Sequence, residues 1–251
     1  MSVVAVCSGK GSPGATFVAV NLAAALARTR ERVMLVDVDP AGGDIAAYLG
    51  LDPHRGLYPL LRMDRGASDT NAMLREAQER LGVLAVGGFP VEASAESRDA
   101  LPALMDRMRE HGSVVVADVG RVSEHTAGIA ARAEVVLLVV RPDLVSVLGA
   151  ERTLRALQDA GGVRDRVRLV VSGAERHRPG DLAEVSTALK VEVLCSIPFA
   201  RREARRGLVQ QAPVAKGRLA KAFKELASSV LDSNAKPRVE ACASGLVEVP
   251  A

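Results

Sequence analysis

The chain has 251 residues, of which 48% are hydrophobic, and it carries a formal net charge of +3. This length and composition suit one sizeable domain, with two small domains as the alternative. No run approaches the roughly 18 apolar residues of a membrane span, and the N-terminus lacks the basic flank of a signal peptide, so we expect a cytoplasmic protein.

Short runs rich in Val and Leu alternate along the chain with segments of helical periodicity. The predicted strands are Val3–Cys7, Arg32–Asp37, Gly82–Val86, Ser113–Asp118, Glu134–Val140, Val167–Ser172 and Glu192–Ile197. The predicted helices are Ala15–Arg28, Ser97–Glu110, Ser146–Ala160, Asp181–Leu189 and Gly217–Leu231. This alternation predicts an α/β fold, a doubly wound and mostly parallel sheet of about seven strands with helices on both faces.

Two further expectations concern the ends of this pattern and the thiols. One domain is expected over residues 1–231, followed by a disordered tail over residues 232–251, which loses periodicity and gains Pro, Ser and Gly. As an alternative for part of this tail, residues 246–249 form a short partner-binding segment. Cys7 and Cys195 lie in apolar strand-like runs and are expected to be buried, reduced thiols.

A glycine-rich turn joins the first predicted strand to the first predicted helix. Gly9, four residues, Gly14 and then Thr16 match the phosphate-binding frame G-x-x-x-x-G-K-[ST], but Ala15 stands where the lysine belongs. Glycines let backbone N–H groups converge on phosphate oxygens, and the helix N-terminus adds a favourable dipole. The missing ammonium removes a contact worth about 1.5–3 kcal/mol, so we expect weaker but retained nucleotide binding. A glycine-rich turn of an unrelated α/β fold is the alternative.

Lys10 lies inside this turn, in the stretch GKGSPGAT. The stretch resembles the deviant Walker A motif of the ParA/MinD family of P-loop ATPases, with Lys10 in the place of the signature lysine. The resemblance implies an ATP-dependent homodimer in which Lys10 reaches the partner's phosphates and serves catalysis, and a solvated lysine is the alternative. The nucleotide-binding residues that it implies here are Gly9, Lys10, Gly11, Ser12, Pro13, Gly14, Ala15, Thr16 and Phe17.

Three carboxylates lie at the ends of predicted strands. Asp37 and Asp39, two residues apart, point the same way and can face a Mg²⁺ shell and an attacking water. RVMLVDVDPAGGD resembles the family's second strand, which implies that Asp37 holds a metal-bound water and that Asp39 orients the nucleophile. SVVVADVGR resembles a Walker B strand ending in Asp118, with Gly120 near the γ-phosphate and Thr16 as a Mg²⁺ ligand. On its own, each aspartate could instead be a helix cap or a turn residue.

The later strand ends resemble the family's base-binding segments, with departures. The strand ending in VVSG has Ser172 where the family usually has an adenine-reading Asn, and a serine offers one hydroxyl. Pro198 and Phe199 are expected to wall the purine, and Ala200 replaces a common acidic residue. The resemblance implies ATP and Mg²⁺ as ligands and leaves adenine specificity open.

Atypical loops of this kind occur in the CpaE/TadZ branch, whose members position pili or secretion machinery at cell poles. The sequence starts at its first predicted strand, without the receiver-like domain that this branch often carries, so another MinD-like branch is the alternative. Two functions are open: a nucleotide-dependent dimer switch with weak or slow hydrolysis, and a pseudo-ATPase scaffold that binds protein partners. The three aspartates and Lys10 favour the switch, and Ala15 and Ser172 favour the scaffold.

The expected partners are a second copy of the chain and proteins of a positioning, pilus, secretion or partitioning system, at cell poles, the nucleoid or the inner membrane surface. A basic stretch, residues 201–207 with Lys216, Arg218, Lys221 and Lys224, is expected to be a solvated surface, with non-specific DNA binding as the alternative. The helix Gly217–Leu231 is expected to pack on the sheet instead of docking on a membrane.

Overall fold

The computed structural model describes residues 3–9, 14–29, 32–39, 43–51, 75–78, 81–84, 105, 114–123, 126–161, 163–174 and 179–232. Its strands are β1 (Val3–Ser8), β2 (Val33–Asp37), β3 (Arg75–Gln78), β4 (Leu81–Leu84), β5 (Val114–Arg121), β6 (Val135–Val140), β7 (Val167–Ala174) and β8 (Val193–Pro198). Its helices are α1 (Ala15–Ala27), α2 (Ile45–Leu49), α6 (Ala127–Arg132), α7 (Leu144–Asp159), α8 (Pro179–Leu189), α9 (Arg201–Gln210) and α10 (Arg218–Leu231), with a 3₁₀ turn η1 at Val163–Arg166.

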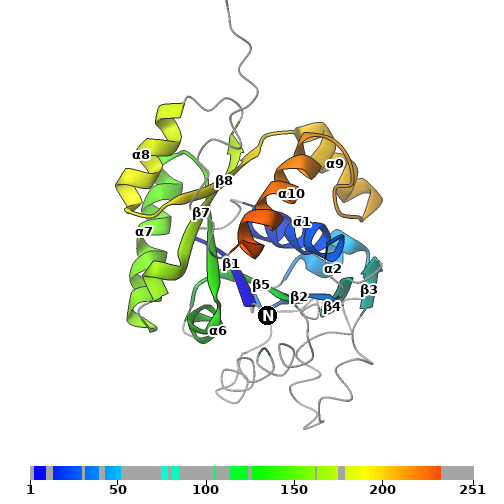
Figure 1. Ribbon diagram of the computed structural model, residues 1–251, viewed down its shortest axis with the longest axis horizontal. Coiled ribbons are helices and arrows are strands. Elements are labelled where there is room, and N and C mark those ends of the chain that lie inside the picture. The colour runs from blue at the N-terminus through cyan, green and yellow to red at the C-terminus, as the bar shows by residue number, and fades with distance from the viewer. Residues whose placement is uncertain are drawn as a thin grey trace, which may run out of the picture.

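The strands form one sheet in the order β3-β4-β2-β5-β1-β6-β7-β8. All seven predicted strands are confirmed and pair in parallel, and β3 adds an antiparallel edge strand. In the sheet, β2 lies on one side of β1, and the later strands β6, β7 and β8 lie on the other side (Figure 1). The strand order therefore reverses at β1, and ligands of such sheets bind beyond the carboxyl ends of the strands at this point.

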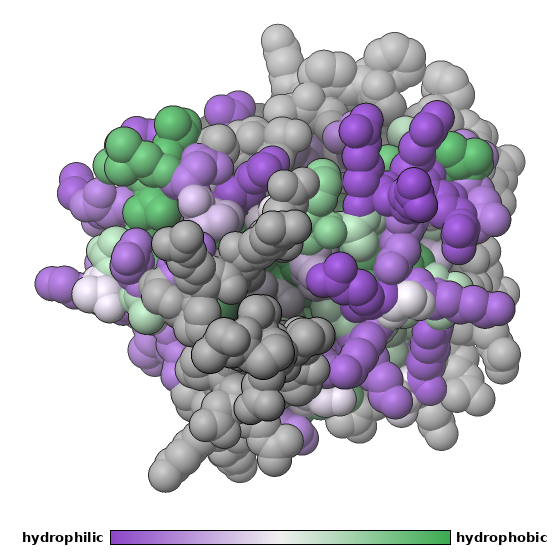
Figure 2. All heavy atoms as spheres, turned by 90° about the horizontal axis from the view of Figure 1, so that it is seen from above, coloured by the Kyte–Doolittle hydropathy of each residue, from purple (hydrophilic) through white to green (hydrophobic). Residues whose placement is uncertain are grey.

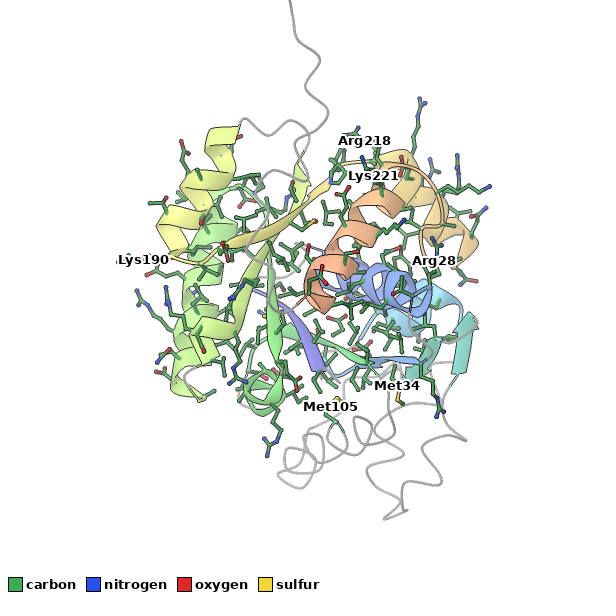
Figure 3. All side chains as sticks on the ribbon, viewed as in Figure 1. Arg28, Met34, Met105, Lys190, Arg218 and Lys221 are labelled. Atoms are coloured by element: carbon green, nitrogen blue, oxygen red, sulfur yellow. The ribbon has the colours of Figure 1, made fainter. Side chains whose placement is uncertain are left out.

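Two helical layers cover the sheet, and the alternation of side chains in β1 shows both. Val3, Ala5 and Cys7 face a core shared with α6, α7 and α8. Val4 and Val6 face a core shared with α1, α2 and α10. In Figure 3, Met105, which belongs to the first of these cores, lies below the sheet. The strands are thus buried on both faces, which explains why their sequences are continuous apolar runs.

Four of the five predicted helices are confirmed as α1, α7, α8 and α10. The fifth, residues 97–110, lies outside the described residues apart from Met105, and the predicted tail lies outside them apart from Asp232. The sequence did not reveal α2 and α6 because five and six residues are too few to show a helical period. It did not reveal α9 because that helix buries only Gly207 fully and so has no apolar stripe.

The packing of α10 confirms the expectation for the C-terminal helix. Leu219, Phe223, Leu226 and Val230 are buried in the core that contains α1. The predicted thiols are also confirmed, because Cys7 and Cys195 are both buried thiols. None of the helices in the described part of the chain is long and apolar enough to cross a membrane.

Candidate functional site

The glycine-rich turn runs between the end of β1 at Ser8 and the start of α1 at Ala15. Gly14 has a φ of 97°, which lies in the left-handed region that glycine adopts at little cost. Its carbonyl oxygen accepts the hydrogen bond of Val18 N–H at 2.9 Å. The first N–H groups of an α-helix point out of its N-terminus, and Gly14 has no side chain that could accept from them, so an anion placed there can do so.

Part of the predicted loop lies outside the described residues. Lys10, Gly11, Ser12 and Pro13 belong to this part, so their predicted contacts stay predictions. Ala15 is only 7% exposed and packs in the core with the rest of α1. Its methyl group places no charge in the site.

The first glycine of the loop lies directly against α7. A Cβ atom placed on Gly9 would overlap the main chain of Gly149 and Ala150, and one placed on Gly149 would lie 2.7 Å from the Gly9 carbonyl oxygen. Both positions therefore require glycine for close packing of two backbones. The loop is thereby fixed to α7, a contact that the phosphate-binding frame alone does not predict.

Three predicted carboxylates converge at the ends of β2 and β5. Asp37 and Asp118 lie side by side in the parallel register of these strands. The Asp39 carboxylate lies on Gly120, and the Asp37 carboxylate lies on Gly43, since a Cβ atom on either glycine would overlap that carboxylate. Backbone N–H groups also contact the cluster: Asp39 N donates to Asp37 Oδ1 and Gly120 N donates to Asp118 Oδ1, each at 3.2 Å. The structure therefore confirms that these side chains meet.

Burial makes Asp37 and Asp118 weaker acids than an exposed aspartate. It raises the pKa of Asp37 well above 3.8, and the neighbouring Asp118 charge raises it further. Burial also raises the pKa of Asp118 to about 6, and hydrogen bonds from the Thr16 side chain and the Gly120 backbone lower it in part. The other charges that act on Asp118, those of Asp39 and Asp44, raise its pKa again. A cation bound here would relieve this repulsion.

The donor set fits a Mg²⁺ ion bound together with a phosphate ligand. Asp118 Oδ2 is buried and has no hydrogen-bond partner among the described residues, although such atoms are normally satisfied. In the described part of the chain, no three Asp, Glu, His or Cys side chains form a direct metal cage. Mg²⁺ prefers oxygen ligands and keeps several waters, so Thr16, waters and phosphate oxygens would complete its shell.

The predicted base-binding residues lie on neighbouring strand ends. Ser172 is 8% exposed, and its Oγ lies 3.4 Å from a Cβ placed on Gly14, so the structure brings it against the loop. Pro198 ends the adjacent strand, and Phe199 follows it with 42% of its surface exposed. The predicted Phe17 ring instead packs edge-to-face on Tyr48 and Phe223, so only its backbone is left for a nucleotide.

A buried asparagine, which the sequence did not single out, connects the site to the outer helices. Asn21 of α1 donates from Nδ2 to Tyr48 Oη at 3.4 Å and accepts Val214 N–H at 2.7 Å. Tyr48 belongs to α2, whose first residue, Ile45, donates its N–H to Asp37 Oδ2 at 3.2 Å. A polar residue inside a mostly apolar helix was the available signal, but its partners are distant in sequence.

Comparison with known proteins places these features in a family. The family model of the CobQ/CobB/MinD/ParA nucleotide binding domain matches residues 4–210. The chain is 23% identical over 204 residues to the septum site-determining protein MinD of Thermotoga maritima, covering 78% of this chain and 75% of that protein. It is 32% identical over 170 residues to the chromosome-partitioning ATPase Soj of Thermus thermophilus, covering 66% of each chain, so it spans about two thirds of that protein.

A solved structure shows the same fold. It is the septum site-determining protein MinD of Pyrococcus horikoshii OT3, complexed with Mg-ADP. The match has a TM-score of 0.76 at 20% identity and covers 92% of this chain and 96% of that chain. At this identity the likeness shows the fold and leaves the ligand of the present chain to its own residues.

Proposed function

Because this chain belongs to the CobQ/CobB/MinD/ParA family of nucleotide-binding domains, we propose that it is an ATP-binding positioning or partitioning protein. In this proposal the bound nucleotide drives dimerisation, and weak or slow hydrolysis reverses it. MinD and Soj, two proteins that it resembles, are a septum site-determining protein and a chromosome-partitioning ATPase.

The observation that carries the proposal is the Asp118 carboxylate. It is buried, its pKa is raised to about 6 and its Oδ2 has no partner among the described residues. Such an arrangement is unfavourable in a protein that binds nothing, because the hydrogen bonds from Thr16 and Gly120 compensate the buried charge only in part. Mg²⁺ bound with a nucleotide would compensate the rest of that charge, which gives the carboxylates a role in a loop that has Ala15 in the lysine position.

Each residue has a defined task in this proposal. The N-terminus of α1, which begins after Gly14, binds phosphate oxygens through its N–H groups. Thr16 and Asp118 would hold Mg²⁺ and Asp37 would bind one of its waters; the ion, when bound, would supply positive charge against the phosphates. Asp39 lies on Gly120, where its carboxylate can orient a water for attack on the terminal phosphate. Without a lysine at position 15, part of the stabilisation of the transferred phosphoryl group is missing, so turnover is slow.

A hydrophobic patch beside the loop supports dimerisation at this edge. Leu144, Val145 and Leu148, in the first two turns of α7, are 73%, 59% and 45% exposed. The same helix contacts the loop through Gly149 and Gly9. Exposed apolar patches mark interaction surfaces, so a second chain that faces the loop would also cover these side chains.

The basic surface lies elsewhere, on α9 and α10. Its described members are all exposed, and they are Arg201, Arg202, Arg205, Arg206, Lys216, Arg218, Lys221 and Lys224. Figure 3 places Arg218 and Lys221 at one end of α10, and Figure 2 shows hydrophilic side chains gathered on this side of the molecule. Exposure of every member favours a solvated surface, and non-specific DNA binding stays the alternative.

The alternative function is a pseudo-ATPase scaffold, which Ala15 and Ser172 favour. A nucleotide-binding titration beside a steady-state phosphate-release assay separates the two functions. We expect Mg²⁺–ATP to bind in the micromolar range or more weakly, with slow phosphate release that Asp39→Ala abolishes. Binding without release above the Asp39→Ala background would identify the scaffold, and no heat at millimolar ATP would refute nucleotide binding altogether.

A further inference from the structure

The proposed nucleotide site has a surplus of negative charge. Asp37, Asp39 and Asp118 converge there, and Ala15 contributes no cation. A triphosphate would add several more negative charges, of which one Mg²⁺ offsets only a part. If the site binds nucleotide, as proposed above, a cation from another element would strengthen that binding.

Two arginines flank the strand that leads into the loop. Ser8, the last residue of β1, lies in register with Arg121 of β5 on one side and with Val139 of β6 on the other. Arg141 follows β6, two residues after Val139. Arg121 directly follows Gly120, on which the Asp39 carboxylate lies, so it is placed beside the carboxylate cluster. Arg141 lies on the opposite side of the loop, toward β7.

Specific contacts hold Arg141 between the start of α7 and the end of β7. Its backbone N–H donates to Ser146 Oγ at 2.9 Å, at the start of α7. Its Cζ and Nε atoms lie 3.9 Å from a Cβ placed on Gly173, and Gly173 follows Ser172 in β7. Ser172 Oγ in turn lies 3.4 Å from a Cβ placed on Gly14. The guanidinium therefore lies at Gly173, next to the serine that faces the loop, where a φ of 73° and a register shift interrupt the regular alternation of side chains in β7.

Among the described residues, the Arg141 guanidinium has one ion pair, and its Nη groups are not part of it. This ion pair joins Arg141 Nε to Asp143 Oδ2 at 3.9 Å, between side chains that are 48% and 44% exposed. The other carboxylate oxygen, Asp143 Oδ1, caps α7 by accepting Ser146 N–H at 2.8 Å. A long, half-exposed pair of this kind contributes little, while the planar fork of arginine matches the geometry of phosphate oxygens.

We propose that Arg141 contacts the phosphates of the bound nucleotide and supplies the positive charge that Ala15 lacks. The lysine of the usual frame would come from the first turn of α1. Here the cation is Arg141, which directly follows β6. It lies two residues after Val139, the residue of β6 that pairs with Ser8.

The test compares four variants by isothermal titration with Mg²⁺–ATP and with tripolyphosphate, which has no base. Arg141→Ala is expected to lower the affinity for both ligands roughly ten- to a hundredfold, because a charge-assisted hydrogen bond is lost. Arg141→Lys keeps the charge without the fork and is expected to lie between this variant and the wild type. Arg155→Ala, which removes an exposed arginine of α7, is the control and should bind like the wild type. The fourth variant, Arg121→Ala, removes the competing cation and should lose less than Arg141→Ala.

Adding the usual lysine provides a second measurement. In the Arg141→Ala background, Ala15→Lys is expected to restore most of the lost affinity, while in the wild type it should add little. Equal gains in both backgrounds would overturn the inference, because the two cations would then act independently. Thermal unfolding of each variant shows whether it is folded.

The failures of the two proposals are distinguishable. If the wild type binds both ligands and Arg141→Ala binds them equally well, only the role of Arg141 is overturned. The same holds if Arg121→Ala carries the larger loss, or if Arg141→Ala weakens ATP but not tripolyphosphate, which would mean a contact to the nucleoside. A wild type that binds neither ligand contradicts the proposed function itself.

Discussion

Asp118 shows at the level of one residue how function and stability oppose each other. Its carboxylate is buried beside Asp37, and its pKa of about 6 lies above the ordinary value of 3.8. A carboxyl whose pKa is raised by folding destabilises the folded state wherever the unfolded chain is ionised. This penalty is absent below about pH 4, grows as the pH rises toward 6 and is complete above that value. A bound Mg²⁺ would reduce it.

Asp118→Asn removes this charge with little change of shape. Without Mg²⁺ and nucleotide, we expect the variant to unfold with a free energy about 1–3 kcal/mol larger than the wild type at about pH 8. The gain should shrink as the pH falls through 6 and disappear near 4, because the wild-type carboxyl is then protonated in both states. Urea unfolding at several pH values measures this difference. A variant that is less stable than the wild type at about pH 8 would contradict the assignment of an uncompensated carboxylate.

At the level of elements, the contact between the loop and α7 is the least predictable feature of the site. Gly149 lies in the interior of a helix, where glycine normally costs about 1 kcal/mol relative to alanine. It is retained at the point where α7 meets the backbone of Gly9. The exposed patch of Leu144, Val145 and Leu148 belongs to the same helix, so a partner bound there and a ligand in the loop would contact one rigid element.

Gly149→Ala should therefore destabilise the protein although alanine favours helices. The added Cβ would lie 2.7 Å from the Gly9 carbonyl oxygen, and backbone must move to relieve it. We expect a loss of about 1–3 kcal/mol in the free energy of unfolding, together with weaker nucleotide binding. Gly128→Ala in α6 is the control for helix propensity and should be neutral or stabilising. If the free energy of unfolding of Gly149→Ala equals or exceeds that of the wild type, the contact tolerates a methyl group.

Over the whole molecule, the sequence predicted the sheet well because buried parallel strands are continuous apolar runs. The strand ends at Asp37 and Asp118 were predictable for the same reason, since parallel strands bring their carboxyl ends to one edge. The β3 strand was missed because REAQ contains no apolar run. Gly149 and Arg141 were missed because their roles depend on loop and strand neighbours that the local pattern does not identify.

The proposed function requires a nucleotide-dependent dimer, and we expect this dimer to depend on Lys10. Two triphosphates brought face to face repel each other in a partly desolvated interface. With Ala15 in each loop, Lys10 is the cation that the loop sequence itself offers to the partner's phosphates. Lys10→Ala should therefore weaken the dimer more than it weakens nucleotide binding by one chain.

Sedimentation velocity of wild type and Lys10→Ala, with and without a slowly hydrolysed ATP analogue, tests this claim most directly. The wild type should be monomeric alone and dimeric at saturating analogue, and Lys10→Ala should stay largely monomeric under the same conditions. If the wild type stays monomeric at saturating analogue, or if both proteins dimerise equally, the nucleotide-dependent dimer is contradicted.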